Sequence, residues 1–444
     1  MNDMKATVAR RRTVWRLAAR RWRAKAQAAR GRAMRAGGQV ARLAAALALG
    51  CAAAAAAPER LNVLGWRDYV EPATLESFAA QTGVDVVYDS YDDEAAMEAR
   101  LRRPGDYDVV IVPAARLADL AAAGLLRPLD LAAIPNAAGL DAAILAKLAV
   151  LDPGRRHGLP YLWFATGLAF DAARIDPAKP DTIRPDAIRP DGAKSPGGAS
   201  GVLSAGAPAG APAAGAFSPG AFPAAAPAGD PAVSWDLALR PDKLARFADC
   251  GVSSPDAPEA LFALALRQLR LDPSSTRPLD LRRAADLLAP LRRAAQRTKG
   301  DDVEAGLASG EICLAVTTSL TAARAARRAR EGESGADIRF VVPREGAPIL
   351  IDALAVPAAA RRPQTAFAFI NYLLRPQTAA RATNATRLAN AAPASRQWIA
   401  RDVAADQTIY PPPEASARLF AAPTPDAAGR QAMAREWART AAGR

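Results

Sequence analysis

The sequence predicts an α/β protein built on mainly parallel sheets flanked by helices. From residue 61 onward, short β-branched runs alternate with segments of helical periodicity, which is the pattern of a parallel sheet covered by helices. The run 107–113 is apolar almost throughout, as expected of a strand that is buried on both faces. A chain of 444 residues is also too long for one ordinary core, so we expect two domains.

The elements follow one another along the chain with recognisable starts and stops. Pro72 opens the first expected helix and Gly83 follows its end, the usual asymmetry of helix termini. An aromatic, extended segment at 161–170 leaves the first domain. The expected strands are 61–64, 85–90, 107–113, 311–317, 338–342 and 349–356. The expected helices are 72–81, 94–102, 117–123, 256–269, 279–297 and 365–374, with a terminal helical region from Arg418 onward.

Residues 172–233 differ in composition from the sequence on either side. Pro, Ala, Gly and Ser dominate there, and neither a strand period nor a helix period is visible. Such a segment offers too little large apolar surface to offset the entropy of ordering it. The sequence therefore predicts a disordered Pro/Ala/Gly insertion on the surface.

The formal net charge of +13 is concentrated in one place. Residues 1–50 hold two lysines and eleven arginines against a single aspartate, a charge of +12. The rest of the chain, with 45 basic and 44 acidic residues, is close to neutral. A nucleic-acid-binding domain spreads its basic residues over a folded face, so no nucleic acid is expected as a partner.

The first 57 residues are interpreted as a signal peptide with an extended basic leader. The basic run is followed by an apolar stretch from Leu43 and then by small residues, which predicts export to the periplasm. Several details stay open. Translation starts either at Met1 or downstream at Met34, cleavage falls among residues 52–57, and Cys51 raises the alternative of a lipoprotein. Arg11-Arg12 also resembles a twin-arginine pair in a poor context.

Export makes the remaining cysteines informative. With Cys51 removed or lipidated, Cys250 and Cys313 are left in an oxidising compartment, where a disulfide is the natural expectation. The alternative is two independent buried thiols.

The sequence argues against an enzyme. His157 is the single histidine and stands in a loop-like context, so no histidine-based triad has its orienting partner. Acid pairs such as 92–93 and 301–302 are typical of solvated loops. No phosphate loop, dinucleotide fingerprint or metal-ligand spacing is present, and we expect no cofactor and no metal.

Ten short motifs, running in order from about residue 60 to 440, resemble those of the periplasmic polyamine-binding proteins of bacterial ABC importers, above all the putrescine-binding type. They are 65–69 (GWRDY), 82–89 (TGVDVVYD), 106–113 (DYDVVIVP), 159–163 (LPYLW), 234–237 (SWDL), 250–253 (CGVS), 256–259 (DAPE), 310–313 (GEIC), 369–376 (FINYLLRP) and 409–412 (IYPP).

This resemblance implies the two-lobed, type II periplasmic binding protein fold, with ligand held between the lobes. We expect the first lobe at 58–164 and 348–385, and the second at 165–347 and 386–444, with the insertion 172–233 inside it. The family also has a disulfide like the one expected between the two cysteines. A monomer that delivers its ligand to a membrane permease is implied.

The ligand site implied by the resemblance combines aromatic walls with carboxylates for ammonium groups. Trp66 and Tyr69 would wall the ligand, and Asp68 and Asp352 would accept its ammonium protons. Each has a structural alternative, since aromatics commonly pack in cores and Asp68 could cap a turn. Trp163 is either a wall or a core residue.

Other pocket positions depart from the family pattern. Arg67 replaces a serine, and Thr318 and Thr321 stand where the family has a tryptophan and an aspartate. Further departures are Ala114, Ala260 beside Glu259, Leu350 and Leu388. If Arg67 faces the ligand, these changes favour a molecule with one amine and one anionic group, such as an ω-amino acid. If it faces solvent, that shift loses its main cause.

The predicted function is thus the periplasmic solute-binding component of a polyamine (putrescine-type) ABC transport system. Two alternatives stay open: a receptor of the same fold for an ω-amino acid or related amine, and an exported sensory or scaffold protein that no longer binds polyamine.

Overall fold

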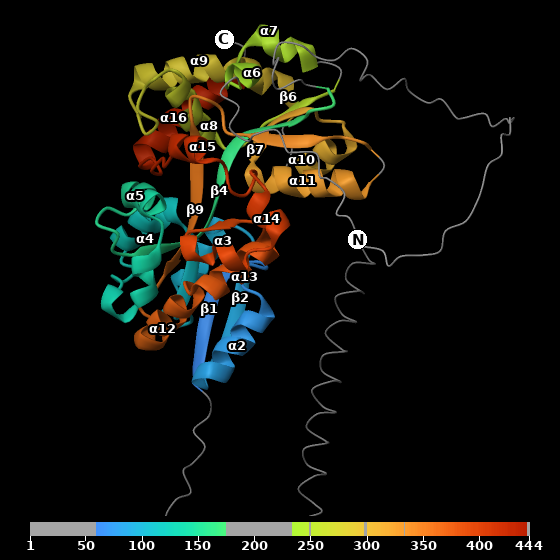
Figure 1. Cartoon of the computed structure of the whole chain (residues 1–444). Coiled ribbons are helices and arrows are strands. Elements are labelled where there is room, and N and C mark those ends of the chain that lie inside the picture. The colour runs from blue at the N-terminus through green and yellow to red at the C-terminus, as the bar shows by residue number, and fades with distance from the viewer. Residues whose placement is uncertain (1–58, 175–232, 248–249, 297–299, 333, 442–444) are drawn as a thin grey trace, which may run out of the picture. The chain divides into compact units, whose positions relative to one another are not determined.

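A computed structural model describes residues 59–174, 233–247, 250–296, 300–332 and 334–441 (Figure 1). The predicted leader, including Cys51, lies outside the described residues. So does the predicted insertion, except for its two ends. At these ends the Ala172 N–H donates to the carbonyl of Asp337 at 2.7 Å, and the buried Val233 accepts from the Arg344 N–H at 2.9 Å. The described parts of both ends are therefore bound into the fold.

The first arm of the sheet consists of three parallel strands, which confirm three of the predicted strands. They are β1 (Arg60–Trp66), β2 (Asp85–Tyr91) and β3 (Val109–Pro113), and β1 lies between the other two. The side chains of β3 from Val109 to Val112 are fully buried, as its composition predicts. The connecting helices are α2 (Pro72–Thr82), α3 (Glu94–Leu101), α4 (Leu117–Ala122) and α5 (Ala142–Leu151).

Local signals explain where these helices begin and end. Pro72 is the first residue of α2, and Gly83 closes the helix in the left-handed conformation, with φ of 74°. The Asp93 side chain caps α3 by accepting from the Ala96 N–H at 2.7 Å. The polypeptide after each parallel strand is thus fixed at the carboxyl edge of the sheet, where α/β proteins place their ligand sites.

Two long antiparallel strands connect the first arm to a second one. In β4 (Gly158–Asp171) and β9 (Ala347–Ala355), pairing runs from Gly158 opposite Ala355 to Ala165 opposite Ile349. At one end β9 pairs with β3, and at the other β4 pairs with β7 (Leu314–Thr318) and β8 (Ile338–Val341). These crossover strands make the sheet mixed, while the predicted parallel pairing holds within each arm (Figure 1).

The second arm continues from β7 through β5 (Val252–Ser253) to β6 (Ala295–Gln296). Its helices are α6 (Asp236–Leu239), α7 (Pro241–Leu244), α8 (Pro258–Gln268), α9 (Pro278–Ala294), α10 (Gly300–Ser309) and α11 (Ser319–Glu331). The terminal α16 (Ala427–Ala441) packs against α8 and α9. Within the described ranges, no helix is both long and apolar enough to cross a membrane.

The segment after β9 returns to the first arm before it ends on the second. It contains α12 (Pro363–Leu373), α13 (Pro376–Thr386), β10 (Ala389–Asn390), α14 (Arg401–Ala405), α15 (Pro413–Arg418) and β11 (Leu419–Phe420). Of these, β10 pairs with β4 at residues 162–163, and residues 393–398 contact α13. The lobe boundaries stay a prediction, and these contacts favour counting 386–398 with the first lobe.

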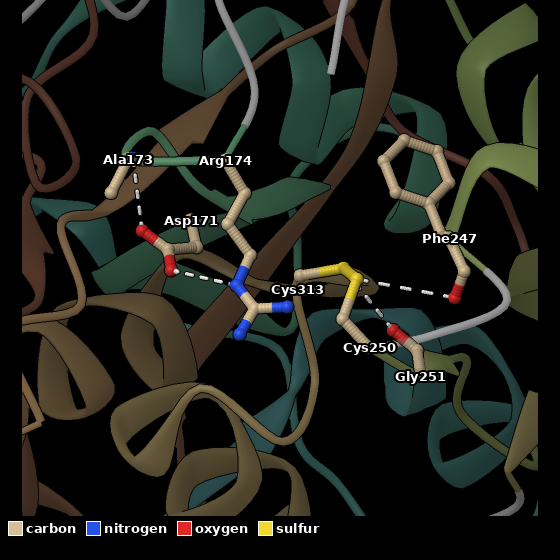
Figure 2. The surroundings of a disulfide bond; sticks show 7 residues. All are labelled: Asp171, Ala173, Arg174, Phe247, Cys250, Gly251 and Cys313. Carbon is tan, nitrogen blue, oxygen red and sulfur yellow. Dashed lines mark hydrogen bonds and ion pairs between the residues drawn. A yellow bond between two sulfur atoms is a disulfide. The ribbon is translucent and has the colours of Figure 1, made fainter. Parts of the chain in front are cut away.

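The predicted disulfide is present between Cys250 and Cys313, whose Cα atoms lie 5.6 Å apart (Figure 2). It joins the residues that lead into β5 and β7. The Cys313 N–H also donates to the Cys250 carbonyl at 3.1 Å. The bond therefore reinforces a pair of strands that already lie side by side.

Candidate functional site

The turn that follows β1 is held by tyrosines from β2 and β4. The Tyr88 hydroxyl donates to the Trp66 carbonyl at 2.6 Å, and the Tyr161 hydroxyl donates to the Tyr69 carbonyl at 3.2 Å. Gly65 leaves room for this approach, because a Cβ there would collide with the Tyr88 hydroxyl. Asp68 adopts the left-handed conformation, with φ of 62°, which aspartate tolerates better than most residues.

Asp352 on β9 binds both aromatic side chains of this turn. Its Oδ1 accepts from the Trp66 indole Nε1–H at 3.0 Å, and its Oδ2 accepts from the Tyr69 hydroxyl at 2.8 Å. The Tyr91 ring packs on Trp66 with centroids 4.4 Å apart. Three of the predicted site residues, Trp66, Tyr69 and Asp352, are thus brought together from segments far apart in the sequence.

The carboxylate of Asp352 is 4% exposed, and both of its donors are neutral. Burial raises its pKa to about 6, the two hydrogen bonds oppose that rise, and the nearby charge of Glu94 adds to it. Burial and the charge of Asp352 raise the pKa of Tyr69, so its hydroxyl remains a donor. No lysine or arginine of the described chain forms an ion pair with Asp352. The ionised carboxylate thus has no positive charge beside it among the described residues, and a cationic group bound there would supply one.

Arg67 and Asp68 lie differently from their neighbours in the turn. The Arg67 guanidinium donates to Asp92 at 2.7 Å, and these two side chains are 64% and 71% exposed. Arg67 therefore faces solvent with its charge balanced, a placement that does not favour its predicted role as a ligand-binding residue. Asp68 is exposed, and within the described residues its carboxylate makes no hydrogen bond.

Thr318 and Thr321 lie on the second arm, where β7 leads into α11. The Thr318 side chain caps the helix by accepting from the Thr321 N–H at 3.1 Å, and the two hydroxyl oxygens are 3.1 Å apart. The Ser319 hydroxyl accepts from the Ala165 N–H of β4 at 3.4 Å. No hydrogen bond between described residues links these threonines to Asp352, so a ligand role for them stays a proposal.

Trp163 belongs to the core. It is buried, its Nε1–H donates to the Asn390 carbonyl at 3.2 Å, and its ring meets that of Tyr410 edge-on. Leu388 is likewise buried, whereas Leu350 is partly exposed on β9. The core alternative for Trp163 is therefore the one that the structure supports.

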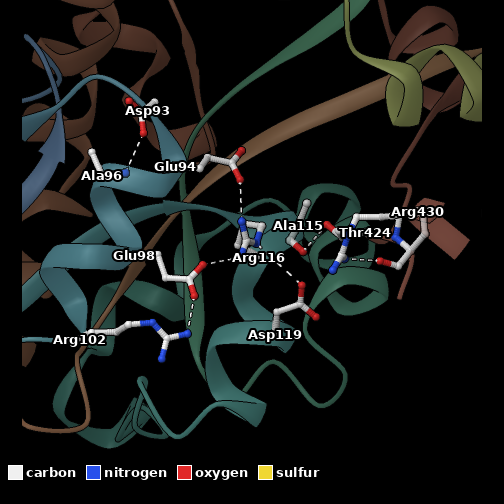
Figure 3. A network of polar contacts seen from close by, with 11 residues as sticks. Asp93, Glu94, Ala96, Glu98, Arg102, Ala115, Arg116, Asp119, Thr424 and Arg430 are labelled. Carbon is white, nitrogen blue, oxygen red and sulfur yellow. Dashed lines mark hydrogen bonds and ion pairs between the residues drawn. The ribbon is translucent and has the colours of Figure 1, made fainter. Parts of the chain in front are cut away.

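Sequence reasoning missed the groups that surround the cluster. Tyr88, Tyr91 and Tyr161 were not predicted as site residues, although the first two lie on β2, the strand beside β1. Glu94 and Arg116 were missed as well. Arg116 contacts three carboxylates of the helices that follow β2 and β3, namely Glu94 and Glu98 of α3 and Asp119 of α4 (Figure 3). The sequence did contain a signal for Glu94, because it is an acidic residue at the start of α3, shortly after the strand that pairs with β1.

The family model for bacterial extracellular solute-binding proteins matches residues 64–380. The chain belongs to this family. It is also 30% identical, over 402 residues, to the putrescine-binding periplasmic protein PotF of Escherichia coli (strain K12), covering 90% of this chain and 96% of that one. Identity to the putrescine-binding periplasmic protein SpuD of Pseudomonas aeruginosa is 29% over 385 residues, covering 86% of this solute-binding protein and 92% of SpuD.

Among solved structures, the spermidine/putrescine transporter substrate-binding protein PotD of Streptococcus pneumoniae superposes with a TM-score of 0.66. The two sequences are 19% identical, and the match covers 86% of this solute-binding protein and 99% of PotD. The fold is thus the two-lobed α/β periplasmic binding protein fold. As a member of a binding-protein family, the chain is not an enzyme.

Proposed function

We propose that this solute-binding protein is the periplasmic receptor of a polyamine ABC importer, with putrescine or a closely related diamine as its ligand. The observation that carries the proposal is the Asp352 carboxylate, which is buried beside aromatic rings and bound only by neutral donors. A protonated amine supplies the missing positive charge, and the faces of Trp66 and Tyr69 suit its methylene groups and its charge.

The charge around the first-arm loops supports a cationic ligand. Asp68 follows β1, and Asp93 and Glu94 follow β2. Two basic side chains lie in the same region, Arg67 after β1 and Arg116 after β3, and each forms an ion pair with a carboxylate. An excess of carboxylates at the edge of the sheet attracts cations and raises their local concentration.

The relatives support the same ligand class. PotF and SpuD are named as putrescine-binding proteins, and each match covers most of both chains. Proteins of this kind hand their solute to a membrane permease, which is the partner we propose here.

The hypothesis of an ω-amino acid as ligand depended on an unpaired Arg67 that faces the ligand. Because Arg67 pairs with Asp92 in solvent, that ligand class has lost its main argument and is not proposed.

Isothermal titration calorimetry on the mature protein tests the proposal with putrescine, spermidine and γ-aminobutyrate. We expect putrescine to bind and γ-aminobutyrate to bind much more weakly. Asp352→Asn should weaken putrescine binding at least about 30-fold, because truncating one partner of a buried charge pair costs roughly 2–5 kcal/mol. Asp85→Asn, at the exposed opposite end of β2, is the matched control and should bind like the unmodified protein. Failure to bind any polyamine, or a preference for γ-aminobutyrate, would contradict the proposal.

A further inference from the structure

Glu94 acts on the candidate amine site without a hydrogen bond to Asp352, Trp66 or Tyr69 among the described residues. It is the first residue of α3, three positions after Tyr91, which pairs in register with Trp66 and packs on its ring. Its side chain is 45% exposed. Its Oε2 accepts from the Arg116 guanidinium at 3.0 Å, while its Oε1 has no hydrogen-bond partner among the described residues (Figure 3). One carboxylate oxygen is therefore anchored and the other is available.

Arg116 holds Glu94 in place but cannot neutralise all the carboxylates around it. Only 23% exposed, it also donates to Glu98 at 2.9 Å and lies 3.8 Å from Asp119. Glu98 has a second cation, Arg102, at 2.6 Å, whereas Arg116 is the one cation that the described chain gives Glu94. Three carboxylates share two cations, so one negative charge is left over, and Glu94 and Asp119 are the two without a second cation. Of these two, Glu94 is the one whose charge acts on Asp352.

We infer that Glu94 is a specificity-determining residue of the amine site, adding a second negative charge to that of Asp352, and that Arg116 is the positioning residue that orients it. The inference rests on the proposed function and deepens it, because two carboxylates select for ligands with high positive charge. The charge of Glu94 raises the pKa of both Asp352 and Tyr91, so it acts across the site. Besides Glu94, the titratable side chains that interact with Asp352 are Tyr69, Tyr88 and Tyr91.

A purely structural role for Glu94 makes a different prediction. An acid in the first turn stabilises a helix, and a salt bridge to Arg116 would do no more than fix α3 against the following loop. Glu98 has that structural role too, one turn further along the same helix and on the same arginine. Glu98→Gln therefore releases Arg116 in the same way as Glu94→Gln, but it leaves the charge beside Asp352 intact.

The experiment compares Glu94→Gln, Glu94→Asp and Glu98→Gln in the mature protein by calorimetry with putrescine and with the monoamine 1-aminobutane. We expect Glu94→Gln to weaken putrescine binding by roughly two- to five-fold, the range of a partly exposed ion pair. The loss should exceed that for 1-aminobutane and shrink at high salt. Glu94→Asp should restore part of the affinity, and Glu98→Gln should change it little. Equal losses in the two Gln variants, or no loss in Glu94→Gln, would overturn the inference while leaving the proposed function standing.

A second readout needs no ligand. Because the Trp66 indole N–H bonds directly to Asp352, its nuclear magnetic resonance signal, assigned with Trp66→Phe, follows the protonation of that carboxylate. Glu94→Gln should move the titration midpoint to lower pH and Glu98→Gln should leave it in place. An unmoved midpoint in Glu94→Gln would overturn the inference, whether or not putrescine binds. Failure of putrescine to bind would by itself count only against the proposed function.

Discussion

At the scale of single residues, the burial of Asp352 affects both the stability of the ligand-free protein and its affinity for a ligand. Its ionised form is buried with only Trp66 and Tyr69 as donors, so the folded, ligand-free protein pays for a charge that water would solvate in the unfolded chain. The ammonium group of the proposed ligand would remove that penalty. On the proposed function, the same feature lowers the stability of the free protein and raises the affinity for a cation.

Asp352→Asn should for this reason stabilise the ligand-free protein at pH 8. Burial raises the folded-state pKa to about 6 from 3.8, so the carboxyl group favours folding when it is protonated. That contribution is complete below about pH 4 and is lost as the pH rises through 6. A shift of this size corresponds to about 2–3 kcal/mol. Urea unfolding at pH 4 and pH 8 measures this contribution. The free energy of unfolding of Asp352→Asn, relative to that of the unmodified protein, should rise by about this amount between pH 4 and pH 8. A pH-independent difference would contradict the prediction.

Part of this site could be predicted from the sequence, and part could not. Trp66, Tyr69 and Asp352 were predicted because they match pocket positions of the family, the first two at the carboxyl end of a strand and Asp352 within one. The orientation of Arg67 could not be predicted, since Asp92 reaches it only because β1 and β2 pair in register and end at the same edge. The hydroxyl bonds of Tyr88 and Tyr161 likewise depend on which strand lies beside which.

At the scale of elements, two successive helices show how the size of buried side chains affects prediction from sequence. The helix α12 carries large apolar residues and was predicted at 365–374 from their spacing. The helix α13 buries small residues, Ala379, Ala382 and Thr383 among them, so no apolar periodicity marks it in the sequence. Strands of two residues, such as β10, carry no period at all and exist only through their pairing with β4.

The disulfide between β5 and β7 should contribute measurably to stability. The bond spans a sequence separation of 63 residues, and closing a loop of that length in the unfolded chain is worth about 4 kcal/mol in the chain-entropy model. The double variant Cys250→Ser/Cys313→Ser should thus lose roughly 2–5 kcal/mol in urea unfolding. Adding a reductant should lower the unmodified protein to a similar value and leave the double variant unchanged. Full stability in the presence of reductant, with both thiols shown to be free, would refute the prediction.

At the scale of the whole molecule, the chain should tolerate replacement of residues 175–232. Their composition offers no apolar face for either arm, and the flanking Ala172 and Val233 keep their own backbone bonds. Those bonds go to Asp337 and Arg344, and the short chain segment between these two residues can span at most about 25 Å. A Gly-Ser linker of about 12 residues can span that distance. The melting temperature should then stay within a few degrees of the original.

A longer replacement, of residues 172–233, serves as the comparison. It removes Val233, which is buried, together with its bond to Arg344. Loss of one buried valine costs about 1.5 kcal/mol or more, so this version should melt visibly lower than the shorter one. A large loss of stability in the shorter replacement would show that residues 175–232 pack against the fold.

The path of β9 has a consequence for how the protein is made. Pro113 at the end of β3 lies beside Asp352, so the strand that completes the first arm and the carboxylate of the candidate site arrive on the same late segment of chain. A nascent polypeptide that ends before residue 347 has synthesised β1, β2 and β3 but lacks both the strand that covers β3 and the carboxylate of the candidate site. Folding that waits for such distant partners is slow. The first arm therefore stays open until the chain beyond residue 347 is synthesised, and the fold and the candidate site are completed together.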